Sequence, residues 1–361
     1  MPEISVIIPI YNSSSTLRSC LDSVLSQTFS DWEALCVYDE SVDESKKILE
    51  EYCAKDGRFV FVQGRNRLLA GARNDGLRKA CGNYVCFLDA DDILRENAFG
   101  KIREEFERRR CDIVVFGTDI APENPPPSEW YRWVLYTRSR FYPRFSRKAL
   151  FAEPCARPFV WRDAFTWNFL GRCGVLFDEG CSVGEDQVFQ LCAFPHAENG
   201  ISFISDRLYE YTWKREGSLM SEYGKDDIFR LGGHIKMCDA VFRYWEERGY
   251  DRLSKKYIAV WATDFLSDEI PSLPSEKRDA LFPAVSELFG KWFPTDFLDG
   301  LPRFAKRKAK ILLGKKNIRL SRLRHRLDVL NREWYWGGFF MTGKFLLKKS
   351  LLALSGGVKN V

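Results

Sequence analysis

The chain has 361 residues, of which 45% are hydrophobic and 29% are charged, a balance that is ordinary for a soluble globular protein. This length is sufficient for one large domain or two. The eleven cysteines form no C-x-x-C pair and there are only three histidines, which argues against a disulfide framework, a zinc site and a histidine-based metal cage.

The two ends of the chain differ in charge. The N-terminal MPEISVIIPI has no basic and apolar leader, and no apolar run reaches the length of a membrane span, so we expect a cytoplasmic protein. From residue 303 onward, 16 Lys and Arg stand against two acidic residues, a net charge of +14. Residues 1–302 carry 39 basic and 48 acidic groups, a net charge of −9. Such asymmetry predicts a C-terminal tail that meets an anionic surface.

In chain order, residues 1–118 alternate between apolar runs typical of strands and apolar residues at helical spacing. The predicted strands lie at residues 4–10, 32–38, 58–63, 84–88 and 113–117. The predicted helices lie near residues 17–25, 48–53 and 70–80, with a fourth directly after residue 92. This alternation predicts an α/β fold with a mostly parallel sheet wrapped by helices. The proline-rich residues 122–127 predict a surface loop or a boundary.

Three carboxylates follow the apolar strand at residues 84–88, within the stretch YVCFLDADDIL. Asp89, Asp91 and Asp92 would lie at the carboxyl end of a parallel strand, where open α/β sheets bind ligands. Carboxylate oxygens suit Mg²⁺ or Mn²⁺, which would in turn hold a diphosphate. The alternative is that Asp92 caps the next helix and that the other two solvate a turn.

Polar residues also follow the other predicted strands. The first strand ends at Pro9, which lacks a hydrogen-bond donor, and at Tyr11. The second is followed by an acidic turn from Asp39 to Asp43 that could bind a base or ribose, or could cap the next helix. Arg73 lies after the third strand. It could offer its guanidinium to a base or phosphate, or it could be a solvated charge on a helix.

Together these motifs resemble the family 2 glycosyltransferases. The resemblance rests on SVIIPIYN, the D-x-S-x-D turn, the GARN-x-G-L-x-x-A-x-G-x-Y stretch and FLDADD, and it is dense over residues 4–118. It resumes over residues 160–189, where a Gly-Glu-Asp sequence ends at Asp186. The family consists of inverting enzymes of the GT-A fold that transfer sugars from nucleotide donors, many of them for bacterial envelope polysaccharides.

The resemblance implies a role for each matching residue. Asp91 corresponds to the metal-binding carboxylate, with Asp89 nearer the ribose and Asp92 as a helper. Asp186 corresponds to the catalytic base of the Glu185–Asp186 pair, although the pair alone could equally begin a capped helix. The nucleotide pocket implied by the family is formed by Pro9, Tyr11, Asp39, Arg73, Asp89 and, from the basic stretch YTWKREGS over the donor phosphates, Arg215.

The sequence departs from the family pattern at three positions. Tyr38 stands where another Asp is usual, Glu40 where Gly or Asn is common, and Leu68 where Gly is frequent. These changes bear on donor preference or loop conformation, and they remove no group that the chemistry needs.

Aromatic residues are concentrated in residues 128–175. Aromatic rings often line sugar sites, but core packing is the plainer interpretation for each of them. The residues are Trp130, Tyr131, Trp133, Tyr136, Tyr142, Trp161 and Trp167.

The C-terminal tail has one apolar stripe at helical spacing, and arginines fill the gaps between its members. A basic amphipathic helix of this kind lies in the interface of anionic membranes. The alternative is a helix docked on the catalytic domain or on a second subunit, as in a homodimer. The stripe consists of Leu320, Leu323, Leu327, Leu330 and Trp334.

These observations predict a GT-A domain over residues 1–220, a helical region over 221–302 and a basic amphipathic tail over 303–361. The expected function is metal-dependent, inverting transfer of a sugar from a nucleotide donor, with UDP as the expected carrier, to a lipid-linked or polysaccharide acceptor at the inner face of the cell membrane. A sugar nucleotidyltransferase would need a glycine-rich loop, which PIYNSSS lacks. An inactive sugar-nucleotide-binding protein is the other alternative, and the intact Asp91 and Asp186 argue against it. No nucleic-acid-binding module accompanies the tail.

Overall fold

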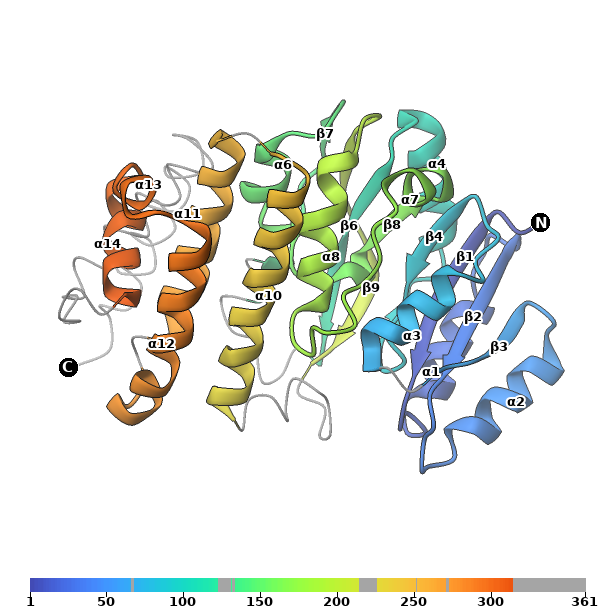
Figure 1. Ribbon diagram of the computed structural model, residues 1–361. Helices are drawn as coiled ribbons and strands as arrows, with labels where there is room; N and C mark the ends of the chain where they lie inside the picture. Colours follow the sequence, from blue (N-terminus) through green and yellow to red (C-terminus); the bar gives the residue numbers. More distant parts are fainter. Residues whose placement is uncertain are drawn as a thin grey trace, which may run out of the picture. The chain divides into compact units, whose positions relative to one another are not determined.

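The computed structural model describes residues 1–65, 68–122, 131, 134–213, 226–250, 252–270 and 273–313. The chain forms two compact units, the first made of residues 1–150 and 154–249 and the second of residues 151–153 and those from 250 onward (Figure 1). Helix α10 (Asp227–Glu247) belongs to the first unit. The first unit therefore extends to residue 249, and the bound of the GT-A domain at residue 220 stays a prediction.

A nine-stranded sheet forms the centre of the first unit, in the order β3-β2-β1-β4-β8-β6-β9-β5, with β7 paired to β9. The strands are β1 (Ile4–Ile10), β2 (Trp32–Tyr38), β3 (Phe59–Gln63), β4 (Tyr84–Phe87), β5 (Ile93–Leu94), β6 (Ile113–Ala121), β7 (Arg140–Tyr142), β8 (Asp163–Thr166) and β9 (Ile201–Thr212). Strands β1 to β4 are parallel, while β8 is antiparallel to both of its neighbours. The predicted α/β architecture with a mostly parallel sheet is confirmed.

Helices follow the first strands as the periodicity predicted. Up to residue 250 they are α1 (Leu17–Leu25), α2 (Ser45–Lys55), α3 (Leu68–Leu77), α4 (Ala98–Arg109), α6 (Arg147–Phe151), α7 (Trp167–Cys173), α8 (Glu185–Ala193) and α10, with short 3₁₀ turns at Pro154–Ala156, Val160–Arg162 and Phe194–His196. The prediction of a helix directly after residue 92 is wrong at its start. Ile93 and Leu94 form β5, because they pair with Glu210 and Tyr209 of β9, and α4 begins only at Ala98.

The strand order determines where a ligand can bind. The chain builds β1, β2 and β3 outward in one direction, and then returns to place β4 on the other side of β1. The carboxyl ends of β1 and β4 therefore form the switch point of the sheet, the place where open α/β sheets bind ligands. Strand β1 is buried along its whole length, as a strand covered on both faces should be.

The second unit is helical, with α11 (Arg252–Glu269), α12 (Ser275–Trp292), α13 (Thr295–Asp299) and α14 (Arg303–Leu312). Helix α14 buries Phe304 and Leu312, and its Lys308 Nζ lies 2.5 Å from Asp264 Oδ1 of α11. Residues 303–312 of the predicted tail thus form a helix packed in this unit, and the boundary at residue 303 stays a prediction. The stripe over residues 320–334 lies outside the described residues. Within the described part of the chain, no helix is both long and apolar enough to cross a membrane.

Candidate active site

The three carboxylates after β4 have different environments. Asp92 is 1% exposed, and its Oδ2 accepts a hydrogen bond from the Tyr209 hydroxyl at 2.7 Å while its Oδ1 accepts one from the Thr212 amide at 2.6 Å. Burial, together with the charges of Asp91 and Asp89, raises the pKa of Asp92 well above its ordinary value. Asp92 therefore secures β9 to the acidic turn, and it does not cap α4, whose N-cap is Asn97.

Asp89 and Asp91 remain at the edge of the sheet, and both are half-buried. The Asp89 amide donates to the Tyr209 hydroxyl at 3.2 Å, and its carbonyl accepts from the Asp92 amide at 3.0 Å. The turn is thus held by one internal backbone hydrogen bond and by the Tyr209 side chain. Its position at the carboxyl end of β4 is the one predicted from the sequence.

Arg73 on α3 lies between two acidic segments. Its Nη2 is 3.0 Å from Asp89 Oδ1, its Nη1 is 2.8 Å from Glu185 Oε1, and the residue is 2% exposed. Burial alone would lower the pKa of Arg73, but the carboxylates of Asp89 and Glu185 outweigh it, so the guanidinium stays charged. Arg73 is therefore not a solvated charge, because both of its terminal nitrogens form ion pairs with carboxylates of the protein itself.

The Glu185–Asp186 pair begins helix α8. Gly184 precedes it with φ = 80°, and a Cβ there would lie 2.5 Å from the Met237 sulfur, so only glycine fits this helix start. Asp186 Oδ2 accepts a hydrogen bond from the Phe159 amide at 2.8 Å. Burial raises the pKa of both carboxyls, and Arg73 opposes that rise. A carboxylate in this setting is a stronger base than one in water.

The loops after β1 and β2 are joined by a set of short hydrogen bonds. The Ser14 amide donates to Asp43 Oδ2 at 2.8 Å, and the Ser45 amide at the start of α2 donates to Asp43 Oδ1 at 3.0 Å. Burial alone would raise the pKa of Asp43, but the hydrogen bonds from Ser45 and Ser14 lower it to about 2. Asp43 thus accepts a hydrogen bond from the first residue of α2, although the N-cap of that helix is Glu44 and not Asp43.

Asp39 follows β2 and is 7% exposed. A Cβ at Gly64, just after β3, would lie 2.0 Å from Asp39 Oδ1, so glycine is required for the two strand ends to approach. Tyr11, which follows β1, is 59% exposed, whereas Pro9 is buried inside β1 and does not end it. Of the strand-end residues predicted for the nucleotide pocket, Tyr11 and Asp39 thus follow their strands, whereas Pro9 lies within β1.

Two departures from the family pattern have a local explanation. Tyr38 is buried against Phe61 with ring centroids 5.7 Å apart, and its hydroxyl accepts from the Ser41 amide at 3.1 Å. Leu68 has φ = 58°, a left-handed conformation that favours glycine, and it is 62% exposed. Arg215, Trp130 and Trp133 lie outside the described residues.

Trp161 packs among other aromatic rings, with Tyr209 at 4.3 Å, Phe159 at 5.1 Å and Tyr211 at 5.5 Å between centroids. It is 3% exposed, which confirms core packing for this tryptophan. Since the Phe159 amide binds Asp186, the ring stack also supports the backbone that holds that carboxylate. No local pattern indicated this link, because Phe159 lies in an irregular segment 27 residues before Asp186.

The described residues include no group of three His, Cys, Asp or Glu side chains arranged to hold a metal ion by themselves. Mg²⁺ is commonly held by one or two carboxylates together with substrate phosphates and water. Asp91, with Asp89 beside it, fits that pattern, whereas Asp92 does not, because its oxygens face β9.

Comparison with known proteins relates this chain to glycosyltransferases. The model of the family "Glycosyl transferase family 2" matches residues 5–176. The protein EpsH of Bacillus subtilis is 37% identical over 256 residues, which cover 67% of this chain and 69% of EpsH. The uncharacterized glycosyltransferase EpsJ of the same organism is 32% identical over 216 residues, 58% of this chain and 61% of EpsJ. The match thus spans less than two thirds of EpsJ.

Among solved structures, residues 1–349 of Staphylococcus aureus TarS in complex with UDP-GlcNAc align with a TM-score of 0.68 at 19% identity, over 87% of this chain and 89% of that one. This likeness confirms the predicted GT-A fold. The match to EpsH and the match to the family model together show that the chain belongs to glycosyl transferase family 2.

Proposed function

We propose that this protein transfers a sugar from a nucleoside diphosphate donor to a hydroxyl group of a glycan or lipid-linked acceptor, with inversion at the anomeric carbon. The single observation that carries the proposal is the position of Arg73, whose two terminal nitrogens bind Asp89 and Glu185. One guanidinium thereby joins the carboxyl end of β4, where a donor would bind, to the helix start that carries Asp186. A donor site and a basic carboxylate side by side are what direct displacement requires.

The donor in this proposal is a UDP-sugar. Asp39 at the end of β2 would accept hydrogen bonds from the base, and the exposed ring of Tyr11 would pack beside it. The TarS structures with UDP and with UDP-GlcNAc show that a protein of this fold binds such a donor. Arg215 would contact the donor phosphates.

Mn²⁺ or Mg²⁺ would be held by Asp91, with Asp89 adjacent, and when bound it would supply positive charge to the leaving diphosphate. Asp186 would accept the proton of the acceptor hydroxyl as that oxygen attacks the anomeric carbon. Its elevated pKa suits this task, because a stronger base takes more of the proton in the transition state. Asp89, held by Arg73, would orient the ribose.

Nucleotide sugars offered one at a time with Mn²⁺ test the proposal, scored by release of nucleoside diphosphate. We expect release from one or a few UDP-sugars, through slow hydrolysis even without the acceptor. Tight donor binding without release would instead indicate an inactive sugar-nucleotide-binding protein. Formation of a nucleotide sugar from a sugar phosphate and a nucleoside triphosphate would indicate a nucleotidyltransferase.

We also propose that residues 314–361 bring the enzyme to the inner face of an anionic membrane. This stretch carries eleven Lys and Arg against two acidic residues. Each basic residue near such a surface contributes about 1 kcal/mol, and several together suffice for reversible anchoring. Because α14 is packed in the second unit, a truncation that tests the tail has to follow Leu313 and not Pro302.

A chain that ends at Leu313 is expected to keep donor hydrolysis and to lose sedimentation with vesicles of phosphatidylglycerol and phosphatidylcholine. The intact chain should bind these vesicles at low salt and be released as the salt concentration rises. Vesicles of phosphatidylcholine alone are the control. If the truncated chain loses hydrolysis, or changes from dimer to monomer, the tail docks on the enzyme or on a second subunit and the anchoring proposal fails.

A further inference from the structure

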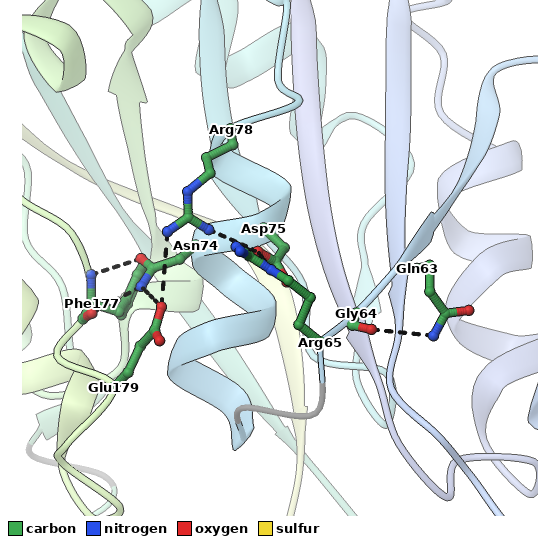
Figure 2. Close-up of polar contacts among 8 residues, drawn as sticks. All are labelled: Gln63, Gly64, Arg65, Asn74, Asp75, Arg78, Phe177 and Glu179. Atoms are coloured by element: carbon green, nitrogen blue, oxygen red, sulfur yellow. Dashed lines mark hydrogen bonds and ion pairs between the residues drawn. The ribbon is translucent and has the colours of Figure 1, made fainter.

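Helix α3 contacts the segment before α8 through Asn74, the residue next to Arg73 (Figure 2). The Asn74 side chain is 1% exposed and forms two opposed hydrogen bonds with one residue: its Nδ2 donates to the Phe177 carbonyl and its Oδ1 accepts from the Phe177 amide, both at 2.9 Å. Its Nδ2 also donates to Glu179 Oε1 at 3.0 Å. The amide thus pairs with the backbone of Phe177 as a neighbouring strand would.

The ring of Phe177 extends this connection to the helix that carries the proposed base. It stacks on Phe189 of α8, with ring centroids 4.2 Å apart and an interplanar angle of 7°. It also meets Phe87 of β4 edge to face at 5.4 Å, and the Arg73 guanidinium lies 5.5 Å from its centroid. Phe177 therefore packs against both β4 and α8, and Asn74 holds its backbone in place.

Two consecutive residues of α3 thus connect to the Glu185–Asp186 region by different routes. Arg73 binds Glu185 directly and Asp89 on the other side. Asn74 acts through Phe177, whose ring supports α8 by stacking on Phe189. Without the Arg73–Glu185 ion pair, or without the contacts from Asn74 through Phe177 to Phe189, helix α8 and its Asp186 could shift relative to the turn after β4. A displacement of 1 Å at a reacting centre can lower a rate by about 10²-fold.

We propose that Asn74 is a positioning residue for this reaction, which aligns Asp186 with the donor by holding Phe177 between β4 and α8. This inference rests on the proposed function and assigns Asn74 no contact with the substrate. A structural residue alone would lower stability without a specific effect on turnover, whereas a positioning residue should lower turnover at unchanged donor affinity.

The variant Asn74→Asp has nearly the same size and keeps an acceptor for the Phe177 amide, but it places an oxygen against the Phe177 carbonyl and the Glu179 carboxylate. Phe177→Leu keeps an apolar side chain and removes the stack on Phe189, so it serves where Asn74→Asp does not fold. Asp75→Asn is the matched control. Asp75 is the next residue of α3 and is also buried, and it forms ion pairs with Arg65 and Arg78 (Figure 2). Arg78 also lies 3.9 Å from Glu179, so this control perturbs the charges around Asn74 and leaves the two hydrogen bonds to the Phe177 backbone in place.

All variants are assayed for release of nucleoside diphosphate from the UDP-sugar that the wild type cleaves, and for UDP affinity by titration, well below their thermal midpoints. For Asn74→Asp we expect kcat to fall by about 10²-fold with the dissociation constant for UDP changed less than threefold. Phe177→Leu should also lower kcat at nearly unchanged UDP affinity, but by a smaller factor. Asp75→Asn should keep wild-type kcat.

Wild-type kcat in folded Asn74→Asp and Phe177→Leu would overturn the inference, as would an equal loss of kcat in Asp75→Asn or a loss of UDP affinity in parallel with kcat. These results leave the proposed function intact, because the wild type is active in each of them. If the wild type itself binds UDP but releases nothing from any nucleotide sugar, the proposed function fails and this inference fails with it.

Discussion

Replacing Asp186 with Asn is expected to reduce the release of nucleoside diphosphate by about 10²–10⁴-fold, the usual contribution of a general base. Asparagine keeps the shape of the side chain and can still accept one of its two hydrogen bonds, which come from the Phe159 amide at 2.8 Å and the Gln187 amide at 2.7 Å. It cannot take a proton from the acceptor. Because that proton moves only in the transition state, donor affinity should stay close to the wild-type value.

Single-turnover release and UDP titration on the same preparation separate these two effects. Asp178→Asn is a suitable control, since Asp178 lies in the same segment before α8 and its Oδ1 accepts a local hydrogen bond from the Gly180 amide that asparagine can also accept. Its Oδ2 lies 3.7 Å from Arg243 Nη2, a partly solvent-exposed pair whose loss should have little effect. Asp178→Asn should retain full turnover. A collapse of donor affinity in Asp186→Asn with normal residual turnover would place Asp186 in the donor pocket and not at the acceptor.

Chelation of divalent ions by excess EDTA, or the substitution Asp91→Asn, is expected to abolish transfer and to weaken donor binding together. The reason is electrostatic: the diphosphate gains charge as it leaves, and without a cation that charge is unscreened in a site that already contains Asp89 and Asp91. The loss in EDTA should be reversed by Mn²⁺ or Mg²⁺. In Asp91→Asn the cation concentration required for half-maximal activity should rise steeply.

The measurement is a cation titration of nucleoside diphosphate release for the wild type, Asp91→Asn and Asp31→Asn. Asp31 is exposed at the opposite, amino-terminal end of β2, so its variant should follow the wild-type curve. Full activity of the wild type in excess EDTA would show that no divalent ion takes part, and the basic groups of the protein would then have to stabilise the diphosphate.

The fold was predictable from the sequence largely because its signals are local. Apolar runs separated by helical periodicities specify β1 to β4 and the helices between them, since each pattern reflects the burial of one short segment. The acids after β4 and the polar turn after β2 were predictable for the same reason. Carboxyl ends of parallel strands share one edge, so these side chains lie at that edge in any strand order, while the order decides which of them are neighbours.

Only the tertiary structure decided what each polar group does at that edge. Arg73 binds Glu185 across 112 residues of sequence, and Asp92 binds the Thr212 amide across 120. Such partners are set by how α3, α8 and β9 pack, and no local pattern distinguishes an arginine that meets a ligand from one that joins two carboxylates. The sequence by itself thus determined the sheet, its ligand-binding edge and the candidate carboxylates. The packing of distant elements decided that Asp92 and Asn74 hold the structure around the site, because burial assigns a polar side chain to whichever partner the fold brings within hydrogen-bonding distance.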